Sequence, residues 1–396
     1  MHVSLDSALG RQRRLNSVGE SVLQIAPNAA AAYSLRSLTG GDPRVVRVRR
    51  VIDNAESDFT ASGVSSGALT SFVNDIQTVG TAVNGTGSFD NYTVSNLSNT
   101  GFSADNSAGG TGSAGFPYVF KDDDVLVVKY TVTNFSSTSS LSPALRGVNN
   151  VNSVTGKTNS GTVFTANGTY TDTLTATADG THLMFADGNT GSYTISDFEI
   201  VSHSSNGFVE TWYDQSGNSN DAVQETAGSQ PKIVSAGTLL NELDFDGTAD
   251  ELAIDFGADL SQANSLFMVH QSDSTSSNSN DFFDRISGSP RTLLDQSGSN
   301  YRMLSASSVS TGVAVTTDKS LVFALYNGAS SLFAKNGTAT SVLNAGTDGI
   351  NQNSSLGSSG SNFYNGTMQE VIIYNSDQSS NRVALETNIN NQYSIF

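Results

Sequence analysis

The segment NGFVETWYDQSGNSND (206–221) gathers the side chains of this chain that are best suited to hold a sugar. It contains the only tryptophan, Trp212, followed by Tyr213, and an aromatic ring offers a flat apolar face for a sugar ring. Three polar residues that can exchange hydrogen bonds with hydroxyl groups follow: Asp214, Asn218 and Asn220. The segment is a candidate site for carbohydrate binding. The sequence favours the structural interpretation, in which Trp212 packs in a core while Asp214 and Gly217 shape the turn that ends a strand.

Two acidic segments, KDDDVLVVKY (121–130) and FADGNTGSYTISD (185–197), are candidates for a structural Ca²⁺ site. Calcium takes several oxygen ligands at once, and Asp187 and Asp197 are the expected contributors. The alternative is that these residues only form turns, in which Asp and Asn are common. The chain contains no EF-hand loop.

Other catalytic chemistries find no support in the sequence. The four histidines are scattered without metal-ligand spacing, there is no cysteine, and neither a G-x-S-x-G elbow nor a phosphate-binding P-loop occurs. Thiolate metal sites and disulfides are therefore excluded.

The composition favours an all-β fold. Of the 396 residues 37% are hydrophobic and only 14% charged, with 37 Gly and 6 Pro, a mixture that suits short strands joined by tight turns. Polar tracts can also be disordered, but 20 Phe and 12 Tyr recur at strand-like spacing. The lack of alternation between strands and helices predicts a sandwich or barrel.

Three segments stand out from this strand pattern. Residues 1–25 form an N-terminal arm, either a short amphipathic helix or a loosely ordered terminus. The run VVRVRRVI (45–52) predicts a strand with Arg47 and Arg49 on a wet face. The last segment, from Ser379 to residue 396, predicts a helix with Leu385, Ile389 and Tyr393 on one face.

The charge distribution excludes one class of partner and suggests others. A net charge of −18 argues against nucleic acid. Residues 1–50 nevertheless carry eight Arg against three acidic residues, so the two ends are expected to meet different partners. The first residues lack the apolar core of a signal peptide, and no run of about 18 apolar residues that could insert into a membrane occurs.

Two groups of motifs carry a resemblance to concanavalin-like β-sandwiches. The first resembles the catalytic domain of α-L-arabinofuranosidase B and its copies in virion proteins of tailed phages, and it comprises AAYSLR (31–36), VRVRR (46–50), DNAESDF (53–59), ALTSFV (68–73) and GFVETWYDQSGNSNDA (207–222). The second is similar to later strands of laminin-G-like modules and comprises LDFDGTADELAI (243–254), SLVFALYNGASSLFAKNGT (320–338) and FYNGTMQEVIIYN (363–375).

The resemblance implies a jelly-roll sandwich that is interrupted by a second one. Residues 26–73 and 206–396 form the discontinuous concanavalin-like domain, and residues 74–205 form an inserted sandwich similar to a carbohydrate-binding jelly roll. A loop whose ends lie close together at the surface tolerates such an insertion.

The resemblance also implies that the catalytic carboxylates of the family are missing. Glycosidic hydrolysis needs two placed carboxyl groups. Ser297 falls at the family's nucleophilic Glu, and Ser359 or Ser361 falls at its acid Asp. The family's paired cysteines correspond to DFFD (281–284). A slipped alignment would restore one carboxylate, Asp284 or Asp295.

The sequence therefore predicts a protein that is not an enzyme. We expect a structural protein of a bacteriophage virion, a tail fibre, spike or capsid decoration, that binds host-surface polysaccharide as a homo-oligomer such as a trimer. The N-terminal arm would bind other virion proteins and the acidic sandwiches would face outward on the virion surface. The alternatives are a secreted arabinofuranosidase-like glycoside hydrolase and a bacterial cell-surface adhesin.

Overall fold

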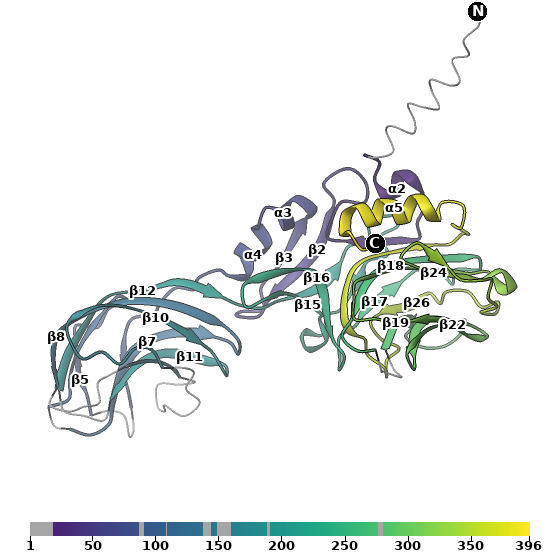
Figure 1. Cartoon of the computed structure of the whole chain (residues 1–396). Coiled ribbons are helices and arrows are strands. Elements are labelled where there is room, and N and C mark those ends of the chain that lie inside the picture. The colour runs from purple at the N-terminus through teal and green to yellow at the C-terminus, as the bar shows by residue number, and fades with distance from the viewer. Residues whose placement is uncertain are drawn as a thin grey trace, which may run out of the picture.

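The computed structural model describes residues 19–86, 91–107, 109–137, 144–148, 160–187, 191–275 and 280–396. Antiparallel strands dominate this part of the chain and form one 18-stranded sheet and two smaller sheets of 5 and 4 strands (Figure 1). A short helix ends the chain. The predicted all-β class and the C-terminal helix are confirmed.

The 18-stranded sheet folds over into the two layers of the main sandwich. One layer contains β24, β23, β18, β27 and β1, and the other contains β17, β26, β19, β20, β21 and β22 in hydrogen-bonded order. The strands of this sheet are β1 (Ala31–Ser34), β2 (Arg44–Arg50), β3 (Glu56–Thr60), β13 (Gly207–Trp212), β14 (Ala222–Val223), β15 (Lys232–Ser235), β16 (Thr238–Asp246), β17 (Leu252–Asp255), β18 (Asn264–Ser272), β19 (Asn280–Arg285), β20 (Thr292–Ser297), β21 (Asn300–Ser305), β22 (Ser308–Ala314), β23 (Ser320–Tyr326), β24 (Leu332–Lys335), β25 (Thr338–Ala339), β26 (Asn353–Leu356) and β27 (Asn365–Tyr374).

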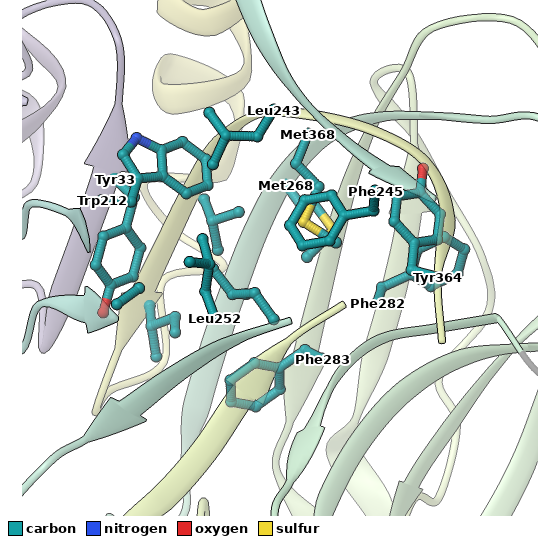
Figure 2. Packing of buried hydrophobic residues seen from close by; sticks show 14 of the residues in the cluster. Tyr33, Trp212, Leu243, Phe245, Leu252, Met268, Phe282, Phe283, Tyr364 and Met368 are labelled. Atoms are coloured by element: carbon teal, nitrogen blue, oxygen red, sulfur yellow. The ribbon is translucent and has the colours of Figure 1, made fainter. Parts of the chain in front are cut away.

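The core of the main sandwich lies between these layers (Figure 2). Leu243, Met268 and Met368 come from one layer, while Leu252 and Phe283 come from the other. Side chains alternate across a regular strand, so such a strand contributes every second residue to this core. The core fixes how the two layers face one another.

The central strands of the first layer are apolar on both faces. In β18, Leu266 and Met268 enter the main core, whereas Phe267 and Val269 belong to a second cluster on the outer face. The C-terminal helix α5 (Arg382–Tyr393) covers this outer face. Strands covered on both faces are continuously hydrophobic.

Among the described helices only α5 is longer than two turns. The predicted face of α5 is largely buried, since Leu385 and Ile389 are fully inaccessible. The remaining described helices are α2 (Val22–Ile25), α3 (Ala61–Ser65), α4 (Ala68–Val73) and two 3₁₀ turns, η2 (Ala227–Ser229) and η3 (Gly328–Ser330). None of the described helices is long and apolar enough to cross a membrane.

Residues between α4 and β13 form the two smaller sheets, which enclose a separate aromatic cluster (Figure 1). Phe102, Phe116 and Phe185 meet at its centre, with ring centroids 5.7 and 5.8 Å from that of Phe102. One sheet contains β5 (Thr93–Ser95), β6 (Phe102–Asp105), β8 (Val125–Ser137), β10 (Gly168–Thr175) and β12 (Gly191–Ser204); the other contains β4 (Val83–Asn84), β7 (Gly112–Phe120), β9 (Ala144–Val148) and β11 (Gly180–Asp187). The predicted domain boundaries at residues 74 and 205 stay predictions.

Two chain connections join these smaller sheets to the main sandwich, and they meet at Asn74. Its Oδ1 accepts a hydrogen bond from the backbone N–H of Ser205 at 3.1 Å, and its Nδ2 donates to the carbonyl of Gly237 at 3.0 Å. Both connections therefore leave the main sandwich at one place.

The basic N-terminal region differs from its sequence prediction in one respect. The arm, residues 1–25, lies largely outside the described residues, which begin at Gly19. Arg49 was expected on a wet face but is only 6% exposed. Its guanidinium donates to Gln230 at 2.7 Å and to the carbonyl of Ala227 at 3.1 Å, because the 3₁₀ turn η2 and the residue after it cover this face of β2.

Candidate functional site

Trp212 lies inside the main sandwich. The side chain is fully buried, and its ring centroid lies 5.6 Å from that of Tyr33 (Figure 2). Its position at the end of β13 gives the core a large apolar surface. The indole therefore has no face open to solvent.

The polar residues after Trp212 bind the backbone of β1 and the segment before it. Asp214 accepts hydrogen bonds from the backbone N–H groups of Ala32 and Ser216, both at 2.8 Å. Asn218 and Asn220 donate through Nδ2 to the carbonyls of Ala29 and Ala30, again at 2.8 Å. These side chains already have partners within the chain.

Tyr213 is partly exposed, in contrast to Trp212. Its hydroxyl donates to Asp58 at 2.7 Å, and the guanidinium of Arg44 lies 4.7 Å from the ring centroid. Burial, followed by the hydrogen bond with Asp58, raises the pKa of Tyr213 to about 12. Sugar binding by this group of residues stays a prediction.

The two predicted calcium ligands lie on different sheets. Asp187 ends β11, and its side chain falls outside the described part; Asp197 lies on β12. Asp197 is exposed and has a φ of 54°, at an irregularity where β12 pairs with β8. Among the described residues no group of three acidic or histidine side chains could hold a metal ion. The calcium site stays a prediction.

A third group of residues forms around β19, where a β-bulge changes which side chains share a face. The pairing with β20 skips from Asp281 to Phe283, so Phe282 and Phe283 both enter the main core. The flanking Asp281 and Asp284 consequently lie together outside it. A regular strand would place residues three apart on opposite faces.

Asp281, Asp284 and Asp295 form a buried acidic cluster with two arginines. Asp281 is directly opposite Asp295 in the pairing of β19 with β20, and all three aspartates are 1% exposed. Arg291 binds Asp284 through two hydrogen bonds of 3.0 and 2.6 Å. Arg302 binds both oxygens of Asp295, one at 2.9 Å.

Asp281 is the member of the cluster without an arginine. Its Oδ2 is buried and has no hydrogen-bond partner among the described residues. Burial raises the pKa of Asp281 to about 6. The hydrogen bond with Ser359 lowers this pKa, and repulsion by the Asp295 carboxylate raises it. Burial also raises the pKa of Asp295, but there the ion pair with Arg302 opposes it.

A polar hollow of about 420 Å³ lies next to this cluster. Asn280, the chain neighbour of Asp281, lines it, together with Asn362, which hydrogen-bonds Asp281. Ser361, one of the serines placed at a catalytic position by the resemblance, lines the same hollow, and Ser359 also hydrogen-bonds Asp281. Ser297 is exposed at the end of β20.

The sequence prediction named Asp284 and Asp295 as possible catalytic carboxylates. It assigned no function to Asp281, Arg291 or Arg302. Arg291 and Arg302 each lie seven residues beyond the aspartate they bind, across the hairpins that join neighbouring strands. That spacing alone is a weak signal. The bulge that brings Asp281 to the same side has no sequence signature.

Comparison with known proteins gives only a remote likeness. No family model and no curated protein matches the chain. Trypanosoma rangeli sialidase matches with a TM-score of 0.35 and 15% identity over 47% of this chain and 31% of that chain. A mutant of it displaying trans-sialidase activity matches with a TM-score of 0.32 and 17% identity, over 46% and 31%. The chain thus spans under a third of the length of these proteins.

The prediction that the chain is not an enzyme is contradicted by this comparison, because the similar structures are sialidases. The likeness is too remote to assign a reaction or a substrate. Nothing in the comparison supports the phage, virion or tail-fibre predictions. The arm's partners, the oligomer and the location on a virion stay predictions.

Proposed function

We propose that this chain is a glycoside hydrolase in which Asp281 and Asp295 are the two acidic residues. The proposal rests on Asp281, a buried carboxyl group with one unpartnered oxygen among the described residues, opposite Asp295 on the adjacent strand. Hydrolysis of a glycosidic bond needs one carboxyl group that donates a proton and a second that is ionised.

The surroundings of the two carboxyl groups assign their roles. A pKa of about 6 leaves part of the Asp281 population protonated near neutral pH, as a general acid requires. Arg302 favours the ionised form of Asp295. When the surroundings of two neighbouring carboxyl groups shift their pKa values apart, one group can act as the proton donor and the other as the nucleophile.

In the reaction we propose, Asp281 protonates the glycosidic oxygen as the bond from that oxygen to the anomeric carbon breaks. The Asp295 carboxylate forms an ester with the anomeric carbon. Water then attacks this carbon, Asp281 takes up its proton, and Asp295 is released. Directly opposed side chains on antiparallel strands have Cβ atoms ~4.5–5.5 Å apart. Because the two side chains are direct neighbours, we assign the reaction to the retaining class, whose carboxyl groups lie about 5–5.5 Å apart.

The arginines control access to the cluster. The side chains of Arg291 and Arg302 are 32% and 33% exposed, whereas the aspartates beneath them are 1% exposed. A sugar must therefore displace an arginine from its carboxylate, and the freed guanidinium can donate to sugar hydroxyls.

Hydrolysis of 4-nitrophenyl glycosides tests the proposal. The panel contains the α-L-arabinofuranoside and the β-pyranosides of glucose, galactose and xylose. We expect release of 4-nitrophenol by the wild-type chain, with a loss on the order of 10²-fold or more in Asp281→Asn and Asp295→Asn. NMR of the first sugar released should show retained anomeric configuration.

Asp172→Asn is the matched control, because Asp172 is also buried, at 5% exposure, but lies in the smaller sheets with Tyr130. It should keep full turnover. Wild-type protein that releases no 4-nitrophenol from the panel, or an Asp281→Asn variant as active as Asp172→Asn, would rule out the proposed site.

A further inference from the structure

A pocket of about 630 Å³ opens on the main sandwich where several elements meet. Its walls are α3, residues 240–242 of β16, Gln369 of β27, the end of α5 and the segment after β1. The acidic cluster lies on β19 and β20, in the layer that α5 does not cover. This pocket, which we call the α3–α5 pocket, is thus separate from the proposed active site.

The α3–α5 pocket combines an apolar wall with an aromatic ring. Leu35, Val64 and Leu240 supply the apolar wall, and the half-buried Tyr393 supplies the ring. The Tyr393 hydroxyl is fixed from behind by Ser34 at 3.2 Å and by Glu370 at 3.1 Å. A ring held in this way presents a preformed surface to a ligand.

A buried amide in the same wall lacks a hydrogen-bond donor. Gln369 is 1% exposed; its Nε2 donates to Glu242, while its Oε1 has no partner among the described residues. A buried carbonyl oxygen without a hydrogen-bond donor destabilises the folded state. A ligand hydroxyl that reaches this oxygen would satisfy it.

Lys319 supplies a hydrogen-bond donor to the same pocket. Its ammonium lies 6.0 Å from the centroid of the Tyr393 ring and forms no ion pair with the described residues. The other cation of the pocket, Arg36, is held by Glu370 at 2.7 and 2.9 Å. Lys319 is therefore free to donate to a ligand oxygen.

These features fit a ligand that both donates and accepts hydrogen bonds and has one apolar face, as a sugar ring does. The lining of the pocket carries two cations, Arg36 and Lys319, and two carboxylates, Asp42 and Glu242, so it has no net charge that would favour an ionised ligand. We infer that the α3–α5 pocket is a binding site for a neutral sugar, with Tyr393 as the stacking ring and Gln369 and Lys319 as hydrogen-bonding groups. The inference does not require that the chain hydrolyses the sugar.

Methyl NMR of the full chain, labelled at leucine and valine methyl groups, tests the site directly. The probes are the methyl glycosides of β-glucose, β-galactose, α-mannose and α-arabinofuranose at about 10 mM, above the Kd of roughly 1 mM of a weak complex. We expect at least one probe to shift the signals of Leu35, Val64 and Leu240.

The chain offers a closely matched pair of blocking and control variants. Ser65 and Ser66 are exposed, and each donates its hydroxyl to a backbone carbonyl three residues earlier, at 3.1 and 3.3 Å. Only Ser65 lines the pocket. Ser65→Trp should abolish the shifts and Ser66→Trp should preserve them. Lys319→Met should weaken binding about 10-fold.

The outcomes separate this inference from the proposed hydrolase. Shifts that persist in Asp281→Asn, or in a wild-type chain without hydrolase activity, still support the pocket. Shifts at none of the three residues with any probe, or equal shifts in Ser65→Trp and Ser66→Trp, would overturn it, whatever the turnover of the glycosides.

Discussion

Asp124 and His203 form a buried pair in which His203 Nε2 lies 2.8 Å from Asp124 Oδ2, with side-chain exposures of 0% and 1%. Asp124 also accepts from the hydroxyl of Ser205 at 2.6 Å, and Tyr118 contacts the other ring nitrogen of His203 at 3.0 Å. Asp124 precedes β8 and His203 is near the end of β12, so this network holds the base of the smaller sheets beside the connection at Asn74.

Replacing His203 should destabilise the protein. His203→Leu leaves the buried Asp124 carboxylate without one of its donors, and we expect a loss of about 1–3 kcal/mol in the free energy of unfolding. Urea unfolding measures it. His182→Leu is the control, because His182 is partly exposed and its ring hydrogen-bonds the hydroxyl of the adjacent Thr181 at 2.8 Å. Equal losses in both variants would contradict the importance of the Asp124 network.

Removing the Arg302 side chain should lower the free energy of unfolding more than an ordinary surface substitution does. Arg302→Met leaves the buried carboxylate of Asp295 without its counter-ion, and breaking a buried pair costs about 3–5 kcal/mol. Because Arg302 is a third exposed, the lower end of that range is expected. Arg285→Met, one strand away and without an ion pair among the described residues, should change stability by about 0.5 kcal/mol or less. Similar melting temperatures for the two variants would refute the prediction.

Asp281 should make stability depend on pH in a defined direction. Its pKa is about 6 in the folded chain and about 3.9 in an unfolded one, so the folded state binds the proton more tightly. This group therefore stabilises the folded chain less as pH rises from about 4 to about 6. Asp281→Asn removes the effect, and its stability relative to wild type should improve over that interval by up to about 3 kcal/mol. Denaturant unfolding at both ends of the interval checks this; a pH-independent difference would contradict it.

The segment that forms the smaller sheets should be removable without unfolding the main sandwich. Asn74 and Ser205 are joined by one hydrogen bond, and no described strand of the smaller sheets pairs with the 18-stranded sheet. Replacing residues 76–203 with a short Gly-Ser linker should leave a folded main sandwich. Cooperative thermal unfolding and dispersed NMR signals would support the predicted boundaries at 74 and 205. A molten or aggregated product would show that the main sandwich depends on the excised part.

Strand positions follow from the sequence where both faces of a strand are apolar or where a strand alternates strictly. The run VVRVRRVI predicted a strand and lies largely within β2, and the helical spacing of Leu385 and Ile389 predicted α5. The short helices α3 and α4 gave no periodic signal, because five or six residues are too few to show one.

The candidate site was much less predictable. Counting along the resembling motifs led to serines, whereas the acidic cluster depends on the bulge after Asp281 and on two arginines across hairpins. Trp212 and Asp214 were assigned to a sugar site or to structure by residue type alone. Only the contact of Trp212 with Tyr33 and the bonds of Asp214 to β1 show where these groups lie.

The position of β27 has a consequence for how the chain acquires its structure during synthesis. β27 pairs with β1, more than 330 residues earlier, and with β18, so the first layer stays open until Tyr374 has left the ribosome. Strands β4 to β12 pair only among themselves and are complete once residue 204 has emerged. Contacts of low sequence separation form faster. We therefore expect the segment that contains β4 to β12 to fold first. The segments before and after it form the main sandwich later, because their strands pair with each other.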